Sequence, residues 1–185
     1  MSEPNSVENI ICRVGERFKG KISTPLVVGG WAVNLLGFAR ATIDFDFMIF
    51  EEEFKLVAEI LNSVGYQQTI KTTLYARFES KTNVALPYFD CLFANRQTYD
   101  KLVKTGKEVD LFGAKFILPE VLHIIAMKLH ALKYGNSQRF SKDFNDIIAL
   151  IEINNIDVLS SVFMILCEKY GNDDLYRRIK DVVVR

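Results

Sequence analysis

The sequence contains few of the residues that mark unusual protein classes. Of its 185 residues, three are cysteine, four are proline and ten are glycine. So little proline and glycine excludes collagen-like and low-complexity chains, and a hydrophobic fraction of 49% excludes intrinsic disorder of the whole chain. The cysteines, Cys12, Cys91 and Cys167, are odd in number and lack metal-ligand spacing. We therefore expect no disulfide framework and a reducing, cytoplasmic compartment.

An excess of charge of one sign is also absent. Lys and Arg number 23, as do Asp and Glu, so the formal net charge is zero. Non-specific nucleic-acid affinity comes mostly from basic surface, so this balance argues against duplex DNA as a partner. No apolar run approaches the roughly 20 residues of a membrane span, and the N-terminal residues MSEPNSVEN lack a basic-then-apolar signal segment. We expect a cytoplasmic protein with no membrane partner.

Hydrophobic periodicity predicts a mixed α+β protein. Everything after Pro119 is helical in pattern, with one helix up to Lys133 and a second capped by Ser141 with Asp143. We predict a sheet-bearing core over residues 1–118 and a C-terminal helical lobe over 119–185, packed as one compact unit. Before residue 119 the expected helices are 7–18, 31–36 and 51–62, and the expected strands are 24–28, 43–50, 67–71, 74–79, 84–93, 109–111 and 115–118.

Two acids two positions apart are the most informative feature. Asp44 and Asp46 lie in an apolar strand pattern, so both side chains leave the same face, while Phe45 and Phe47 face the core. Two like charges a few ångströms apart repel by on the order of 1 kcal/mol or more unless a cation lies between them. Mg²⁺ prefers hard oxygen ligands and leaves positions open for phosphates. The pair predicts a divalent-metal site; the alternative is a solvated edge strand.

A third acid, Asp90, lies in another apolar strand pattern, within the segment PYFDCLF. A carboxylate in such a run needs a partner or a cation. If a neighbouring strand brings Asp90 beside the first two acids, three carboxylates can hold two metal ions about 4 Å apart, as in-line phosphoryl transfer requires. This combination favours the metal site over the edge strand.

Four residues that precede the acid pair in the sequence are candidate phosphate contacts. Gly29 and Gly30 lie between an expected strand and an expected helix, where glycine lets the backbone approach a phosphate. The alternative is a tight strand-to-helix turn without a ligand. Arg40 and Thr42 precede the acids, and an arginine there can clamp phosphate oxygens. The alternative for Arg40 is neutralisation of the neighbouring acids by a surface salt bridge.

Together these residues resemble the nucleotidyltransferase fold of the DNA polymerase beta superfamily. That pattern is an apolar residue, Gly-Gly or Gly-Ser, a spacer, then Asp-apolar-Asp/Glu-apolar and a late third carboxylate. Here it is Val28-Gly29-Gly30, a spacer, Asp44-Phe45-Asp46-Phe47 and then Asp90. The form GGWA followed by RATIDFD is most similar to the AbiEii-like nucleotidyltransferase family and to aminoglycoside nucleotidyltransferases.

The C-terminal part adds to that resemblance. The segments AMKLHAL, which contains Lys128, and KDFNDI, which contains Asp143, are similar to the Lys…Lys/Arg-Asp-x-x-Asp helices of AbiEii-like proteins. The segment between Ala131 and Lys142 departs from the pattern, which leaves any phosphate role open between Lys133 and Arg139.

The resemblance implies a mixed sheet flanked by helices and a metal-dependent nucleotidyltransferase. The enzyme would move an NMP group from an NTP to an acceptor hydroxyl and release pyrophosphate. Two Mg²⁺ (or Mn²⁺) ions would be held by Asp44, Asp46 and Asp90, and Asp90 would help to deprotonate the acceptor. The sequence leaves that acceptor open between a small molecule, an RNA end and a protein. The alternative is a non-catalytic binding module with the same fold, such as a toxin–antitoxin component. The implied nucleotide-binding residues are Gly29, Gly30, Arg40, Thr42 and Lys128.

Overall fold

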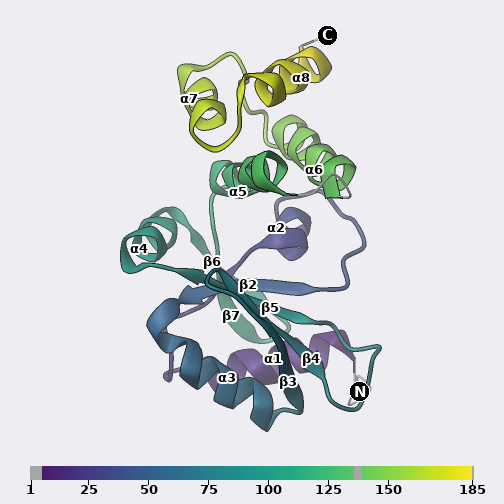
Figure 1. Ribbon diagram of the computed structural model, residues 1–185, viewed down its shortest axis with the longest axis vertical. Helices are drawn as coiled ribbons and strands as arrows, with labels where there is room; N and C mark the ends of the chain where they lie inside the picture. The colour runs from purple at the N-terminus through teal and green to yellow at the C-terminus, as the bar shows by residue number, and fades with distance from the viewer. Residues whose placement is uncertain (1–5, 136–138, 185) are drawn as a thin grey trace. The chain divides into compact units, whose positions relative to one another are not determined.

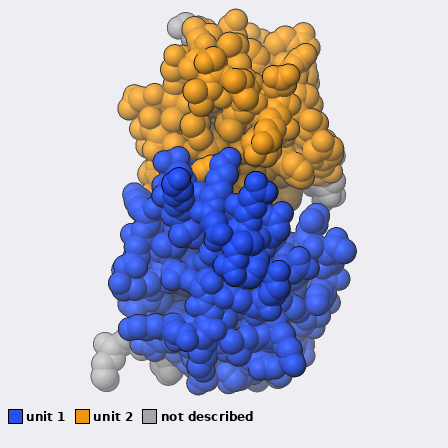
Figure 2. All heavy atoms as spheres, turned by 90° about the vertical axis from the view of Figure 1, so that its left-hand side faces the viewer, with its two compact units in different colours: residues 1–32, 41–120 blue, residues 33–40, 121–185 orange. Residues whose placement is uncertain are grey.

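The computed structural model describes residues 6–135 and 139–184 (Figure 1). The chain divides into two compact units (Figure 2). Unit 1 comprises Met1–Ala32 and Ala41–Glu120, and unit 2 comprises Val33–Arg40 and Val121–Arg185. The predicted sheet-bearing part ended at residue 118, and residues 33–40, which lie within it in sequence, group with the helices of unit 2. We describe each unit by itself.

Unit 1 is built on a seven-stranded mixed sheet with the order β3-β4-β5-β2-β1-β7-β6. Strand β2 is parallel to β5 and β1 is parallel to β7, whereas all other neighbours are antiparallel. Hairpins β3–β4 and β6–β7 form the two ends of the sheet. The mixed sheet expected from the sequence is therefore confirmed. The strands are β1 (Leu26–Val27), β2 (Phe45–Phe50), β3 (Tyr66–Lys71), β4 (Tyr75–Ser80), β5 (Phe89–Ala94), β6 (Lys107–Leu111) and β7 (Ala114–Leu118).

Strand β5 is shorter than the expected strand over 84–93. Val84 is 95% exposed, and the Asn83 side chain accepts a hydrogen bond from the Ala85 backbone N–H at 2.9 Å. An asparagine side chain that bonds the backbone two residues later forms a turn, which competes with a strand ladder. The apolar pattern therefore overestimated the strand at its start.

Helices flank the sheet of unit 1. The Ser6 side chain accepts a hydrogen bond from the Asn9 N–H at 3.2 Å and so caps α1. Helix α4 was not expected, because it buries only Tyr99 and Leu102 and has a weak apolar pattern; the Asn95 side chain caps it. Figure 1 shows α1 and α3 together along the sheet, and α4 packs against β2 and β5. The bounds are α1 (Val7–Phe18), a 3-10 turn (Glu51–Glu53), α3 (Phe54–Ser63) and α4 (Arg96–Thr105).

Aromatic side chains form the core on one face of this sheet. The rings of Phe45 and Phe47 are buried, and Phe47 lies 5.6 Å from the Phe18 ring of α1. Phe89 from β5 lies 5.7 Å from Phe45. Because side chains alternate along a strand, Asp46, between the two buried rings, is directed to the opposite face. This alternation was predicted from the sequence and is confirmed.

In its described residues, unit 2 contains four complete helices and the segment 33–40. Its core includes Leu129, Ile147 and Phe163, all fully buried. The expectation that Ser141 and Asp143 cap a helix is wrong, because α6 begins at Phe140 and has no side-chain cap. Among the described residues, no helix has the length and apolar character needed to cross a membrane. The helices are α5 (Val121–Tyr134), α6 (Phe140–Ile153), α7 (Ser161–Tyr170) and α8 (Asp173–Val183); α2 (Gly29–Leu35) begins in unit 1 and ends in unit 2.

Candidate active site

The sheet of unit 1 places three charged residues in one row across three adjacent strands. Asp46 of β2 is directly opposite Asp90 of β5 in the parallel register. Asp90 is in turn directly opposite Arg77 of β4 in the antiparallel register. Directly opposite residues share a face and interact. The sequence-based expectation that a neighbouring strand brings Asp90 beside the acid pair is confirmed.

Arg77 binds two of the three acids. Its Nε donates to Asp90 Oδ1 at 2.8 Å and its NH2 group donates to Asp90 Oδ2 at 2.6 Å. The same NH2 nitrogen lies 3.8 Å from Asp44 Oδ2, and the guanidinium carbon lies 5.1 Å from the centre of the Tyr88 ring. The hydrogen bond to Asp90 raises the pKa of Arg77 above its ordinary value. The guanidinium is therefore a permanent positive charge among the carboxylates. We call Asp44, Asp46, Asp90 and Arg77 the acidic cluster.

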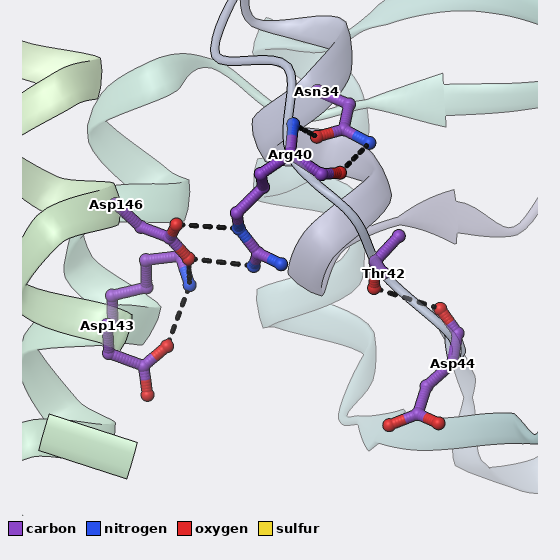
Figure 3. Close-up of polar contacts among 7 residues, drawn as sticks. Asn34, Arg40, Thr42, Asp44, Asp143 and Asp146 are labelled. Carbon is purple, nitrogen blue, oxygen red and sulfur yellow. Dashed lines mark hydrogen bonds and ion pairs between the residues drawn. The ribbon is translucent and has the colours of Figure 1, made fainter. Parts of the chain in front are cut away.

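Solvent reaches the acidic cluster to different extents. The Asp44 side chain is 31% exposed and that of Arg77 is 27% exposed, whereas that of Asp90 is 11% exposed. Just before Asp44, the Thr42 hydroxyl donates to the Asp44 carbonyl at 3.5 Å, and this contact is drawn in Figure 3. Thr42 therefore contacts the backbone that precedes β2, and Asp44 presents its carboxylate at the accessible end of the cluster.

Gly29 lies directly against the acidic cluster. It is the first residue of α2 and has a φ of 59°, a left-handed conformation that favours glycine. A Cβ atom at this position would collide with the Asp46 carboxylate. At the preceding residue, the Val28 N–H donates a hydrogen bond to the Asp46 carbonyl at 3.0 Å, which holds the glycine beside β2. The glycine pair thus forms the tight strand-to-helix turn weighed from the sequence, and it also allows the close approach to Asp46.

The donor set suits a hard divalent cation in its chemistry. Asp44, Asp46 and Asp90 offer only carboxylate oxygens; Asp46 of β2 and Asp90 of β5 come from adjacent strands, and Asp44 lies just before β2. In residues 6–135 and 139–184, no three His, Cys, Asp or Glu side chains already converge as a metal cluster. Asp44 and Asp90 both lie against Arg77. The three acids are of the type that Mg²⁺ prefers, and they lie close together at neighbouring strands. The Arg77 guanidinium lies among the same carboxylates.

Two further predicted site residues belong to unit 2 and form an ion-paired cluster there. Arg40 donates from Nε and NH2 to the two carboxylate oxygens of Asp146 at 2.7 and 2.8 Å (Figure 3). Lys128 Nζ lies 2.8 Å from Asp143 Oδ1 and 2.6 Å from Asp146 Oδ2. Asp146 is 1% exposed, and Lys128 and Asp143 are each 7% exposed. We call Arg40, Lys128, Asp143 and Asp146 the ion-paired cluster.

The ion-paired cluster explains why residues 33–40 group with the helices. Arg40 is tied to α6 by its two bonds to Asp146, and the Asn34 side chain accepts from the Arg40 N–H at 3.0 Å (Figure 3). The Asn154 side chain donates to the Leu36 carbonyl at 3.3 Å. Buried charges need such partners. Asp146 and its pairing with Arg40 were not anticipated, and the segments lie 106 residues apart in sequence.

The structure therefore sorts the predicted site residues into two groups. Asp44, Asp46 and Asp90 lie together in unit 1, with Gly29 against Asp46 and Thr42 before Asp44. Arg40 and Lys128 lie together in unit 2, and their role as nucleotide ligands stays a prediction, as does that of Gly30. Arg77 is the cluster residue that the sequence did not point to. Its only signal was its place on the polar side of the alternating strand 74–79.

Comparison with known proteins defines the class of fold. No protein-family model matches the sequence, and no curated protein matches it. Several solved structures do share the fold. An antigenic nucleotidyltransferase-like protein from Paracoccidioides brasiliensis superposes with a TM-score of 0.55 and 17% identity, over 94% of this chain and 92% of that one. The mixed α/β architecture is nucleotidyltransferase-like.

Two antibiotic-modifying proteins are similar in the same way. ANT(2'')-Ia, solved in complex with adenylyl-2''-tobramycin, gives a TM-score of 0.58 at 12% identity, over 94% of this chain and 97% of that one. The lincosamide antibiotic adenylyltransferase LnuA, solved with lincomycin bound, gives 0.51 at 16% identity, over 70% and 87%. At these identities the likeness establishes the fold, and the activity has to be argued from the site.

Proposed function

We propose that this protein is a metal-dependent nucleotidyltransferase that moves an NMP group from an NTP to an acceptor hydroxyl and releases pyrophosphate. The observation that carries the proposal is the register that places Asp46 directly opposite Asp90, with Asp44 two residues before Asp46 on the same strand path. The nucleotidyltransferase-like fold of the chain also supports the proposal. The AbiEii-like resemblance of the sequence is part of the same proposal.

The three acids of the acidic cluster would bind the metal ions of this reaction. Asp44 and Asp46 would hold two Mg²⁺ ions, and Asp90 would hold one of them and accept the proton of the acceptor hydroxyl. Bound Mg²⁺ would neutralise the triphosphate and orient its α-phosphorus for in-line attack. Gly29 has no side chain and the Asp46 carboxylate fills the space that a Cβ would take, so any contact of Gly29 with a phosphate would come from its backbone. Catalysis would depend on positioning and charge neutralisation.

The ion-paired cluster has a smaller part in the proposed function than the acidic cluster. Lys128 and Arg40 were predicted to contact the nucleotide, and both cations have buried acidic partners in unit 2. A phosphate would have to compete with Asp143 and Asp146 for them. We propose that their first role is to hold segment 33–40 on α6, and that a contact with the triphosphate is secondary.

A non-catalytic binding module is the second candidate. The observation that favours it is the Arg77–Asp90 ion pair, since both oxygens of Asp90 are bonded to a guanidinium. A module of this kind would bind a nucleotide or a protein partner without transferring phosphate. It would show no metal-dependent label transfer.

The decisive experiment separates binding from transfer. The protein would be titrated with each NTP by calorimetry, with and without Mg²⁺, and then incubated with cell extract and NTPs labelled at the α or the γ phosphate. The proposal expects Mg²⁺-dependent NTP binding and transfer of the α label, but not of the γ label, into RNA, protein or a small molecule. Asp44→Asn should lose both, while the matched surface variant Asp174→Asn on α8 should keep them. NTP binding in wild type and Asp44→Asn alike, without label transfer, would favour the binding module.

A further inference from the structure

The acidic cluster holds an internal cation of its own. Three carboxylates and the Arg77 guanidinium make up the cluster, so two negative charges remain among these four side chains. The polar partners of Arg77 are the carboxylates themselves, Asp90 through two hydrogen bonds and Asp44 at 3.8 Å. The guanidinium therefore lies between the carboxylates of Asp90 and Asp44.

The contacts of Arg77 conflict with a divalent cation on the same acids. The fork of Arg77 covers the two oxygens of Asp90 that a metal ion would also use. A cation held by Asp44 and Asp90 would lie close to a permanent positive charge, and like charges at such a distance repel. The Arg77 side chain is 27% exposed, and an arginine on a strand can rotate toward water without disturbing the backbone.

We propose that Arg77 is a positioning residue whose guanidinium holds Asp90 and Asp44 in the metal-free protein and competes with the divalent cation for them, an inference that rests on the proposed function. Arg77 thereby sets the metal affinity of the site. It also keeps the carboxylates from repelling one another when no metal is bound. With a metal ion and NTP bound, the guanidinium would release Asp90, whose carboxylate would then be open to hold the ion.

If Arg77 competes with the metal ion, replacing it should raise the Mn²⁺ affinity, whereas a loss of structure would lower that affinity. Arg77→Gln removes the charge and keeps a polar but shorter side chain, so Mn²⁺ should bind at least about tenfold more tightly than to wild type. Arg77→Lys keeps the charge but lacks the fork that bonds both oxygens, so its Mn²⁺ affinity should lie between the two. A residue with only a structural role would weaken metal binding when replaced.

The experiment uses the full chain and Mn²⁺ alone as the probe. Free Mn²⁺ would be counted by its electron paramagnetic resonance signal during titration of wild type, Arg77→Gln, Arg77→Lys and Arg17→Gln. Arg17→Gln is the matched control, because Arg17 on α1 bonds the Ser63 hydroxyl and its removal changes the net charge equally. Thermal melts of each variant, with and without Mn²⁺, would show that it is folded. Arg77→Gln should have the largest Mn²⁺-induced rise in melting temperature.

The outcomes separate this inference from the proposed function. Tighter Mn²⁺ binding in Arg77→Gln than in wild type and Arg17→Gln supports it, with Arg77→Lys between. Wild-type protein that binds Mn²⁺ as tightly as Arg77→Gln, or more tightly, overturns the inference and leaves the proposed function standing. If Arg77→Gln does not fold, Arg77→Lys decides alone by the same comparison. If no variant binds Mn²⁺, even with NTP present, both the inference and the proposed metal-dependent reaction are overturned.

Discussion

The acidic cluster of unit 1 and the ion-paired cluster of unit 2 are made from similar residue types in different proportions. The ion-paired cluster has two acids and two cations, and its central carboxylate, Asp146, is 1% exposed. The acidic cluster has three acids and one cation, and Asp44 is 31% exposed. Balanced charges can be buried at tolerable cost, whereas an unbalanced set requires water or a ligand ion. The comparison contrasts a buried cluster with equal numbers of acids and cations with a partly exposed cluster in which three acids accompany one arginine.

The largest effect is expected at the centre of the ion-paired cluster. Asp146→Asn removes the buried carboxylate that Arg40 and Lys128 share, so both ion pairs lose their negative charge and unfolding free energy should fall by about 3 kcal/mol or more. Urea denaturation would measure the change. Asp174→Asn removes an exposed carboxylate of α8 and should cost less than about 1 kcal/mol. Equal costs for the two variants would contradict the structural role of the cluster.

A somewhat smaller effect is expected beside the acidic cluster. Gly29→Ala adds a Cβ atom that collides with the Asp46 carboxylate and imposes a positive φ on alanine. We expect a loss of roughly 2–3 kcal/mol, of which the backbone strain alone accounts for about 1–2. Gly20→Ala is the matched control, because Gly20 also has a positive φ but nothing lies within 4 Å of its Cβ position. If urea denaturation gives both variants the same loss of unfolding free energy, the contact with Asp46 does not contribute to the cost of Gly29→Ala.

Replacing the acid that Arg77 binds should cost less than replacing Asp146. Asp90→Asn breaks a charge-assisted pair, but Arg77 is 27% exposed and keeps Asp44 nearby, so a loss of about 1–2 kcal/mol is expected. The same denaturation measurement on Asp90→Asn and Asp146→Asn tests the contrast between the two clusters directly. A cost for Asp90→Asn that equals or exceeds that of Asp146→Asn would reverse the comparison.

The smallest effect on stability is expected at Asp44. Its replacement should change the Mn²⁺ affinity much more than the free energy of unfolding. Asp44→Asn removes a half-exposed acid whose distance to Arg77 is 3.8 Å, so stability should change by less than about 1 kcal/mol. Mn²⁺ affinity should nevertheless fall at least about tenfold, because a metal ligand and a charge are both lost. Electron paramagnetic resonance titration beside a urea melt would show both. Unchanged Mn²⁺ affinity would remove Asp44 from the site.

Much of the acidic cluster could be predicted because its signals are local. The alternation of Asp46 with Phe45 and Phe47 depends only on the pleat of one strand, and the structure confirms it. The strand was predicted from residue 43 but begins at Phe45, so Asp44 lies just before it. That Asp90 lies beside them could be expected only as a hypothesis, since strand order and register are long-range features. The hypothesis held because the parallel pairing of β2 with β5 places Asp46 opposite Asp90.

The parts that escaped prediction depend on contacts between distant segments. Arg77 looked like an ordinary exposed residue of an alternating strand until the register of β4 with β5 placed it opposite Asp90. Arg40 was predicted to contact phosphate, and its ion pair with Asp146 on α6 was not anticipated. Helix α4 lacked a strong apolar pattern because it buries only two side chains. Single-sequence patterns contain no information on which distant charges meet.

The sequence by itself determined the residue types and the local geometry of the candidate site: acids alternating with buried phenylalanines, and a glycine turn before them. These follow from the pleat of a strand and from the freedom of glycine at positive φ, which act over a few residues. Only the tertiary structure decided which cation meets which acid. It placed Arg77 on Asp90 and Asp44, and Arg40 and Lys128 on Asp146. Charge pairing depends on distances across strands and helices, and folding alone sets those distances.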